Sequence, residues 1–293
     1  MILLSVLAAS ALLAVAASAQ TLPGRSLQYL PLLDTLLTEM WPELELRSMF
    51  AAQIEQETCI SVTSKGCWNP RTELKTSREY GFGLGQITII YNSDGSVKSS
   101  TFEEMKKLGG RLAAWKFEDR FDPEMQLRSM ILTEKLLYHR IQFGTATDVD
   151  RLAFTLSAYN GGIGGVMQDR RLCQKPACDN SRWFGHVAVN SRKAKQPIIG
   201  YRTSFYDTNR CYPRYILMDR RPRYAPYLSG KLDRFIDPTA RAPTRADGTP
   251  NGEACAKALP ETGLGRTEVP VRTNSTSPGT GTPRRLAPGT LLP

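Results

Sequence analysis

The feature that most constrains this chain is an apolar helical stretch that ends in a carboxylate, Leu46 to Cys59. As a helix it carries one stripe, spaced by four, four and three residues: Leu46, Phe50, Ile54 and Glu57. Such a stripe belongs in a core, whereas glutamate is almost never fully buried unless it is paired. Glu57 therefore has a partner or opens into a cleft, the alternative being a frayed last turn in water. Glu55 lies about 200° around the helix from Glu57 and faces elsewhere.

The chain is long enough for one sizeable domain with appendages. It has 293 residues and 41% hydrophobic content, which suffices for a core. Residues 1–19 form an apolar run with small residues at its end, which predicts a secretory signal peptide. The run contains no Lys or Arg, so an uncleaved N-terminal anchor is the alternative. From residue 237 the composition turns to Pro, Thr, Gly and Arg, which predicts a disordered tail over 237–293. We expect one domain over residues 20–236.

The charge and the cysteines are interpreted in the light of the export that residues 1–19 predict. Export argues against nucleic acid as a partner, and a net charge of +10 suits an anionic polymer such as the bacterial envelope. The alternative is that this charge only keeps the protein soluble. Six cysteines in an exported chain favour disulfides. Local pairing is the simplest arrangement: Cys59 with Cys67 and Cys173 with Cys178, leaving Cys211 and Cys255. Without a paired CxxC and with only two histidines, we expect no metal site.

The order of predicted elements is mainly helical, with a small β-hairpin. Helices are expected over 26–41, 46–59, from Asp122-Pro123-Glu124 to about 143, and 148–161. Asp94-Gly95 between two β-prone runs predicts the hairpin. Residues 100–103 read as a capping box that opens a further helix. We expect 59–78 to be loop, 163–208 to be irregular, and the segment from Tyr206 to be ordered. The predicted fold class is mainly α, of the α+β type.

Two further stretches contain groups that suit sugar recognition. Gly81 to Gln86 has three glycines in five positions, and the Gln86 amide offers both a donor and an acceptor. A phosphate loop is an alternative, but the Lys-Ser/Thr of such loops is missing. Tyr159 and Asn160 form an aromatic and amide pair just before Gly161-Gly162. The structural alternatives are a glycine turn that serves only the fold, a core tyrosine and a helix-capping asparagine.

Together these stretches resemble the soluble lytic transglycosylase family of the lysozyme-like superfamily. The family's catalytic Glu-Ser appears as Glu57-Thr58, which keeps the hydroxyl, and its A-Y-N-A-G appears at Ala158–Gly162. The predicted helix over residues 121–137 resembles the family's helix before the A-Y-N-A-G motif, and Asn209–Ile216 resembles its C-terminal R-x-Y element. The resemblance covers roughly Leu27–Tyr227 and implies a lysozyme-like fold.

The family's middle motif is matched only in part. It has a Ser and then G-A-x-G-L-M-Q, and the positions in register here are Ser77, Gly83, Leu84 and Gln86. Gly85 replaces the Met, and Tyr80-Gly81 replaces Gly-Ala.

The resemblance implies cleavage of the β-1,4 bond between N-acetylmuramic acid and N-acetylglucosamine in peptidoglycan. Glu57 would be the single catalytic carboxyl, first acid and then base, and the product a 1,6-anhydromuramic end. An apolar wall would raise its pKa, as a proton donor requires. Two-carboxylate glycosidases need a second acid, for which Glu79 is the nearest candidate. The substrate contacts implied are Thr58, Ser77, Gly83, Gln86, Tyr159 and Asn160.

Other functions stay open at this point. A goose-type lysozyme would hydrolyse the same bond, and a non-catalytic glycan-binding envelope or phage assembly protein could use the same scaffold. The tail could recruit the chain to secretion-system or phage machinery. We expect a monomer without an organic cofactor, located in the periplasm or cell envelope, or associated with a phage.

Overall fold

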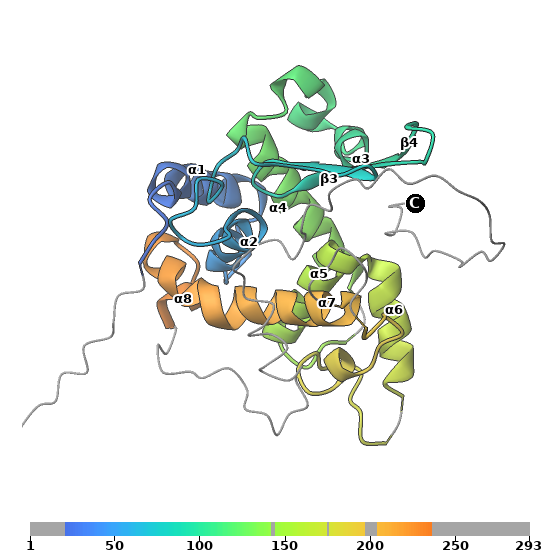
Figure 1. Cartoon of the computed structure of the whole chain (residues 1–293). Coiled ribbons are helices and arrows are strands. Elements are labelled where there is room, and N and C mark those ends of the chain that lie inside the picture. The colour runs from blue at the N-terminus through green and yellow to red at the C-terminus, as the bar shows by residue number, and fades with distance from the viewer. Residues whose placement is uncertain (1–20, 142–143, 175, 197–203, 236–293) are drawn as a thin grey trace, which may run out of the picture.

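The structure is a computed structural model that describes residues 21–141, 144–174, 176–196 and 204–235. The predicted signal peptide and the predicted tail lie outside the described residues. Figure 1 shows helices surrounding one small antiparallel sheet, which confirms the mainly α, α+β class. The helices are α1 (Ser26–Met40), α2 (Ser48–Thr58), α3 (Thr101–Lys107), α4 (Pro123–Arg140), α5 (Asp148–Gly161), α6 (Ile163–Leu172), α7 (Phe205–Arg214) and α8 (Arg221–Tyr224). Short 3-10 turns lie at Gly110–Ala114, Phe117–Asp119, Val187–Val189, Ala225–Tyr227 and Leu232–Phe235.

The sheet is an antiparallel meander in the order β1-β2-β3-β4. Its strands are β1 (Glu73–Lys75), β2 (Glu79–Phe82), β3 (Ile87–Tyr91) and β4 (Val97–Ser100). The predicted hairpin around Asp94-Gly95 is confirmed as β3 and β4. The prediction of loop over 59–78 is wrong at β1, because pairing of Leu74 with Gly81 extends the sheet despite the polar sequence.

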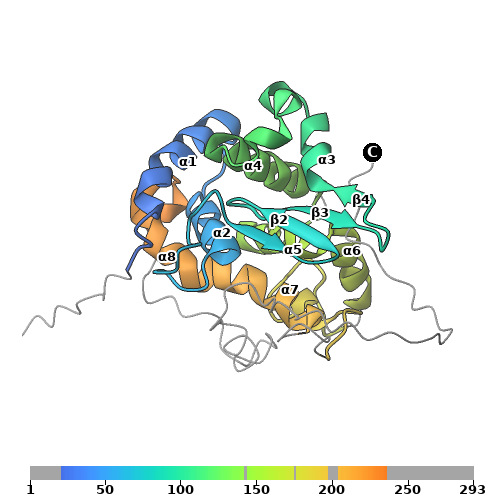
Figure 2. The ribbon, with the colours of Figure 1, turned by 45° about the horizontal axis from the view of Figure 1, so that its top comes forward.

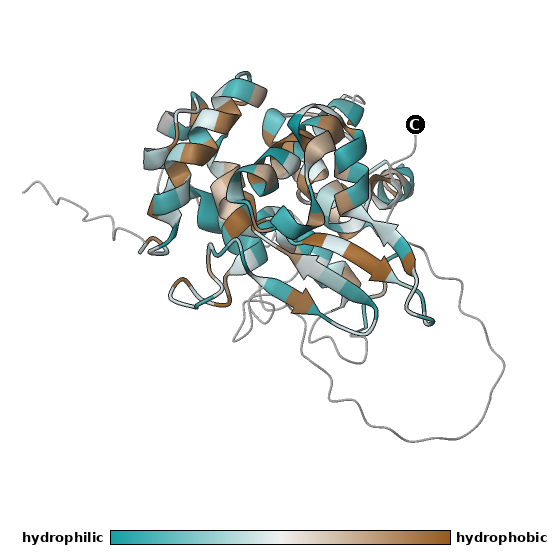
Figure 3. Cartoon of the chain, turned by 90° about the horizontal axis from the view of Figure 1, so that it is seen from above, coloured by the Kyte–Doolittle hydropathy of each residue, from teal (hydrophilic) through white to brown (hydrophobic). Residues whose placement is uncertain are grey.

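The described residues form two large apolar cores. The smaller one packs the sheet against α3 and the 3-10 turns, through Phe82, Phe102 and Trp115. The larger one lies among the helices, with α2 inside it, and the side chains of Phe50 and Ile54 are 0% exposed. Figure 2 shows α2 between α1, α8 and the sheet, and in Figure 3 brown and teal bands alternate along the helices, as expected of amphipathic elements.

Local capping explains where several helices begin. Ser100 caps α3 by accepting from Glu103 N, and Asp122 caps α4 through Glu124 N and Met125 N, as predicted. For α5 the cap is Thr147, which accepts from Asp150 N; the interpretation of Asp148 as the cap is wrong by one residue, because Asp148 is the first residue of the helix. The prediction of irregular chain over 163–208 is wrong at α6, which starts directly after the Gly162 break and buries Val166 and Asp169.

The last helices form one continuous rod, joined by a π-helical segment at Tyr215–Arg220 (Figure 1). This rod packs against α2. In an α-helix, residues twelve apart, such as Tyr212 and Tyr224, differ by about 120° around the axis. A π turn holds about 4.4 residues, so six π residues reduce that difference to about 10°. Both tyrosines therefore face α2.

The two local disulfides that we predicted are present, Cys59–Cys67 and Cys173–Cys178. Cys211 is also disulfide-bonded. Cys255 lies outside the part of the chain that the structure describes. Disulfides are compatible with export. Over the described ranges, every helix is too short or too polar to cross a bilayer.

Candidate active site

Glu57 lies in the last turn of α2 and is half-buried. The stripe that precedes it is fully buried, as the sequence predicts. Its Oε1 accepts a hydrogen bond from the hydroxyl of Tyr212, which lies on α7. The open choice between a paired carboxyl and a frayed end is thereby decided, because Glu57 has a partner from across the domain.

Glu55 is buried on the opposite flank of α2, where it takes no part in this site. Tyr224 donates to its Oε2 at 2.6 Å, and Arg220 lies 3.3 Å from its Oε1. The two glutamates thus face different partners along the same C-terminal rod, in agreement with their angular separation on α2.

A buried polar chain continues from Tyr212 into the core. Gln53 Nε2 donates to Tyr212 Oη at 3.2 Å and to Glu134 Oε1 at 2.8 Å. Gln53 and Glu134 are both 0% exposed. The chain connects α7, α2 and α4 directly behind Glu57.

Burial dominates the electrostatics of this chain. It raises the pKa of Glu134 to about 8, a rise that the Gln53 hydrogen bond opposes and the charge of Glu57 increases. Burial and the charges of both glutamates also raise the pKa of Tyr159 and of Tyr212 well above the ordinary value. Tyr212 is therefore a neutral hydroxyl donor toward Glu57 across the physiological range.

The glycine-rich stretch begins at the end of β2, and its last four residues, 83–86, form the turn between β2 and β3. Gly83 has φ +76°, and a Cβ there would lie 2.4 Å from Gln126 Cδ. Only glycine fits, because the Gln126 amide fills the space: its Oε1 accepts from Leu84 N at 2.9 Å and its Nε2 donates to Pro70 O at 2.9 Å. Gly83 is thus required for docking the turn on α4.

Gln86 closes the same turn in an uncommon backbone conformation. Its φ is +45°, which non-glycine residues rarely adopt. Its Nε2 donates to Gly83 O at 3.1 Å, and its Oε1 lies 2.9 Å from where a Cβ on Gly81 would be. Gly81 therefore leaves room for the amide, and backbone strain of this kind is found at functional sites.

Tyr159, at the end of α5, joins the turn to the glutamates. Its hydroxyl donates to Gly85 O at 2.8 Å, next to Gln86. The charge of Glu57 contributes to the raised pKa of Tyr159, so the two side chains interact electrostatically. All three sequence motifs thus meet in one place.

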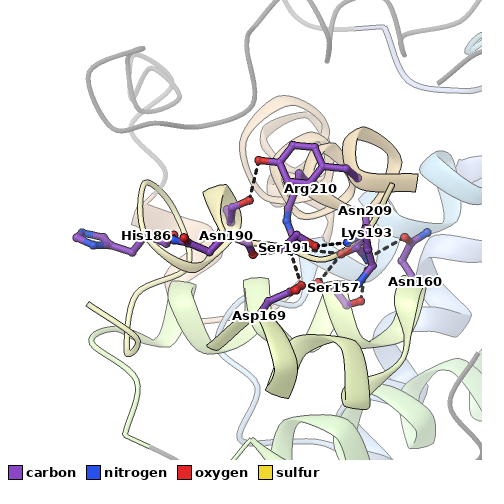
Figure 4. Close-up of polar contacts among 11 residues, drawn as sticks. Ser157, Asn160, Asp169, His186, Asn190, Ser191, Lys193, Asn209 and Arg210 are labelled. Atoms are coloured by element: carbon purple, nitrogen blue, oxygen red, sulfur yellow. Dashed lines mark hydrogen bonds and ion pairs between the residues drawn. The ribbon is translucent and has the colours of Figure 1, made fainter. Parts of the chain in front are cut away.

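Asn160 follows Tyr159 in the sequence and is exposed, and Figure 4 shows it hydrogen-bonded to Asn209. Its Oδ1 accepts from Asn209 Nδ2 at 3.0 Å, and the Asn209 Oδ1 accepts from Ser157 Oγ at 2.9 Å and from Arg210 Nη1 at 2.6 Å. Arg210 is 1% exposed and paired with Asp169. This network fixes the Asn160 side chain from α7.

Two predicted contacts lie in less favourable positions. Ser77 is exposed in the turn between β1 and β2, at the end of β2 opposite to the glycine turn. Thr58 is buried, and its hydroxyl donates to Ile54 O at 2.6 Å and accepts from Trp68 N at 2.9 Å. Thr58 therefore stabilises the end of α2, and the substrate contacts predicted for Thr58 and Ser77 stay predictions.

Sequence reasoning missed two members of the polar chain, Gln53 and Glu134, and it assigned no role to Tyr212, although Tyr212 belongs to the R-x-Y element. For Glu134 the signal was present, because it interrupts an apolar stripe of α4 at helical spacing: Leu127, Met130, Glu134 and Leu137. The same pattern identified Glu57.

Comparison with known proteins supplies no family assignment. No family model matches the chain, and no curated protein matches it significantly. Among the residues that the structure describes, no three His, Cys, Asp or Glu side chains group as metal ligands do.

Proposed function

We propose that this protein is a peptidoglycan lytic transglycosylase with Glu57 as its catalytic carboxyl. The observation that carries the proposal is the meeting of three motifs around one half-buried acid. Glu57 ends a buried helix and is held by Tyr212, and Tyr159 connects it to the turn that bears Gln86. An acid beside an apolar core, with amide and aromatic groups around it, is suited to proton transfer on a sugar.

Glu57 acts first as an acid. Its proton passes to the glycosidic oxygen, the bond from that oxygen to the muramyl anomeric carbon breaks, and the N-acetylglucosamine end leaves with a free hydroxyl. The carboxylate then takes the proton of the muramyl 6-hydroxyl, whose oxygen bonds to the anomeric carbon. The ring closes as 1,6-anhydromuramic acid, Glu57 is protonated again, and no water is consumed. The predicted rise of the Glu57 pKa stays a prediction.

A single carboxyl at the sugar agrees with the burial of Glu134. Retaining and inverting glycosidases use two carboxyls that both reach the glycosidic bond. Glu134 is 0% exposed and lies behind Gln53, so it cannot flank a bond in the substrate. The acetamido group of the substrate itself stabilises the oxocarbenium-like centre in our proposal.

Gly85 replaces the methionine of the family's middle motif, and the surroundings of Gly85 support the family resemblance. Where the family has Met, a Cβ on Gly85 would lie 2.5 Å from Met130 Cγ and 2.8 Å from its Sδ. A methionine from α4 therefore occupies the volume next to the turn. The substrate places the protein in the periplasm or cell envelope, or with a phage, and its proposed partner is the glycan strand.

Mass spectrometry of muropeptides released from purified peptidoglycan tests the proposal. We expect 1,6-anhydromuramic ends from the wild type and none from Glu57→Gln. Glu79→Gln, in β2, is the matched control and should keep the activity. Reducing ends would instead indicate a hydrolase of the goose-lysozyme kind, and binding without products would indicate a glycan-binding protein.

A further inference from the structure

Two buried acceptor atoms behind Glu57 lack a hydrogen-bond partner among the described residues. They are Oε1 of Gln53 and Oε2 of Glu134. The two side chains are already joined through Gln53 Nε2 and Glu134 Oε1, 2.8 Å apart. The two remaining atoms are the amide oxygen of Gln53 and the second carboxyl oxygen of Glu134, and each belongs to a group whose other polar atom already contacts the other residue. A buried acceptor without a donor is unfavourable, which indicates that a proton is present here.

We propose that Glu134 is a positioning residue that carries a proton on Oε2 and donates it to Oε1 of Gln53. A carboxylic acid and a primary amide then form a ring of two hydrogen bonds, which satisfies both acceptors with one proton. The inference rests on the proposed function, because it describes how the acid of that site is held.

The ring fixes the amide that supports the catalytic side chain. The same Nε2 donates to Tyr212 Oη at 3.2 Å, and Tyr212 donates to Glu57. Without the proton, Glu134 can no longer donate, and its charged Oε2 repels Oε1 of Gln53. This repulsion favours rotation of the Gln53 amide away from Tyr212. The carboxyl of Glu57 then loses a fixed donor, although Glu134 itself touches no substrate.

The titratable groups around Glu134 favour its neutral form. Glu57 faces it from α2, and Tyr212 and Tyr159 interact with it from α7 and α5. None of the three supplies a positive charge. A second carboxylate in this place would meet the charge of Glu57 in a buried environment. As the pH rises, Glu134 therefore loses its proton, and the hydrogen bonds from Glu134 to Tyr212 are disrupted, before Tyr159 or Tyr212 ionises.

Three variants separate positioning from chemistry. Glu134→Gln keeps both hydrogen bonds of the ring, so kcat at pH 6 should stay within about threefold of wild type, and the part of the activity loss near pH 8 that comes from Glu134 should disappear. Glu134→Leu and Gln53→Leu remove the ring, so kcat should fall by on the order of 10- to 100-fold at every pH with KM nearly unchanged. The kcat of the double variant, with leucine at positions 53 and 134, should be no lower than that of the less active single variant. Glu124→Gln, on the same helix but ion-paired with Arg128, is the control.

A readout that needs no activity tests the proton directly. Infrared spectra of folded wild type at pH 6 should contain a protonated-carboxyl band that is absent from Glu134→Gln and disappears by pH 9. Absence of this band, full activity of Glu134→Leu, or equal damage by Gln and Leu at position 134 would overturn the inference. If wild type releases no muropeptides while the band is present, the proposed function fails and the protonated Glu134 stands.

Discussion

Glu134 should make the stability of this protein fall as the pH rises. Its folded pKa of about 8 lies above the ordinary 4.5, so the folded state holds the proton more tightly than the unfolded chain. The stabilising contribution is fully present below pH 4.5 and is lost as the pH rises through 8. At about 1.4 kcal/mol per pKa unit, the loss amounts to about 5 kcal/mol. Solvent screening does not reduce this value, because the Glu134 side chain is fully buried.

Urea denaturation at pH 5 and pH 9 measures this effect, with Glu134→Gln as the perturbation. The variant cannot ionise, so its free energy of unfolding should change much less between the two pH values than that of wild type. The Glu124→Gln control should keep the wild-type dependence. Parallel pH profiles for wild type and Glu134→Gln would refute the reasoning, because Glu134 would then titrate alike in both states.

Tyr212→Phe should lower kcat for muropeptide release by about 10- to 100-fold, because a hydrogen bond to a charged group contributes about 1.5–3 kcal/mol; an unchanged kcat would contradict its role. Gly85→Ala should lower the free energy of unfolding in urea by about 1–3 kcal/mol, since its Cβ would overlap Met130, and Met130→Ala should restore part of the loss. Replacing Cys59 and Cys67 by Ser should cost about 2–3 kcal/mol in the same assay, given the short loop that they close. An unchanged unfolding midpoint would argue against either of the last two.

The parts of the fold that follow local rules were predictable from the sequence. Capping residues such as Asp122 specify helix starts through hydrogen bonds within one turn, and the stripe of α2 specifies its burial. Glu57 was found because a carboxylate in an apolar stripe conflicts with burial. The same conflict marks Glu134 on α4, and applying the rule to every helix would have found it.

What escaped prediction depends on contacts between distant segments. Tyr212 is 155 residues from Glu57, and nothing within α7 indicates which acid its hydroxyl meets. β1 has a polar sequence and exists because β2 pairs with it. The exposed position of Ser77 follows from that pairing, because the residue becomes the tip of a hairpin. The spacing of motifs gives distances along the chain, whereas contacts between distant segments decide which residues lie close together in space.

The π-helical segment at Tyr215–Arg220 fixes the length of the C-terminal rod. Loss of one residue there would allow regular α winding, in which Tyr224 would be eleven residues from Tyr212 and only about 20° away around the axis. Tyr224 could then still reach Glu55, and Tyr212 could still reach Glu57. The widened turn thus absorbs one extra residue while one straight helix contacts both flanks of α2, and a further insertion, which would turn Tyr224 by about 100° away from Glu55, should be tolerated less well than a single deletion.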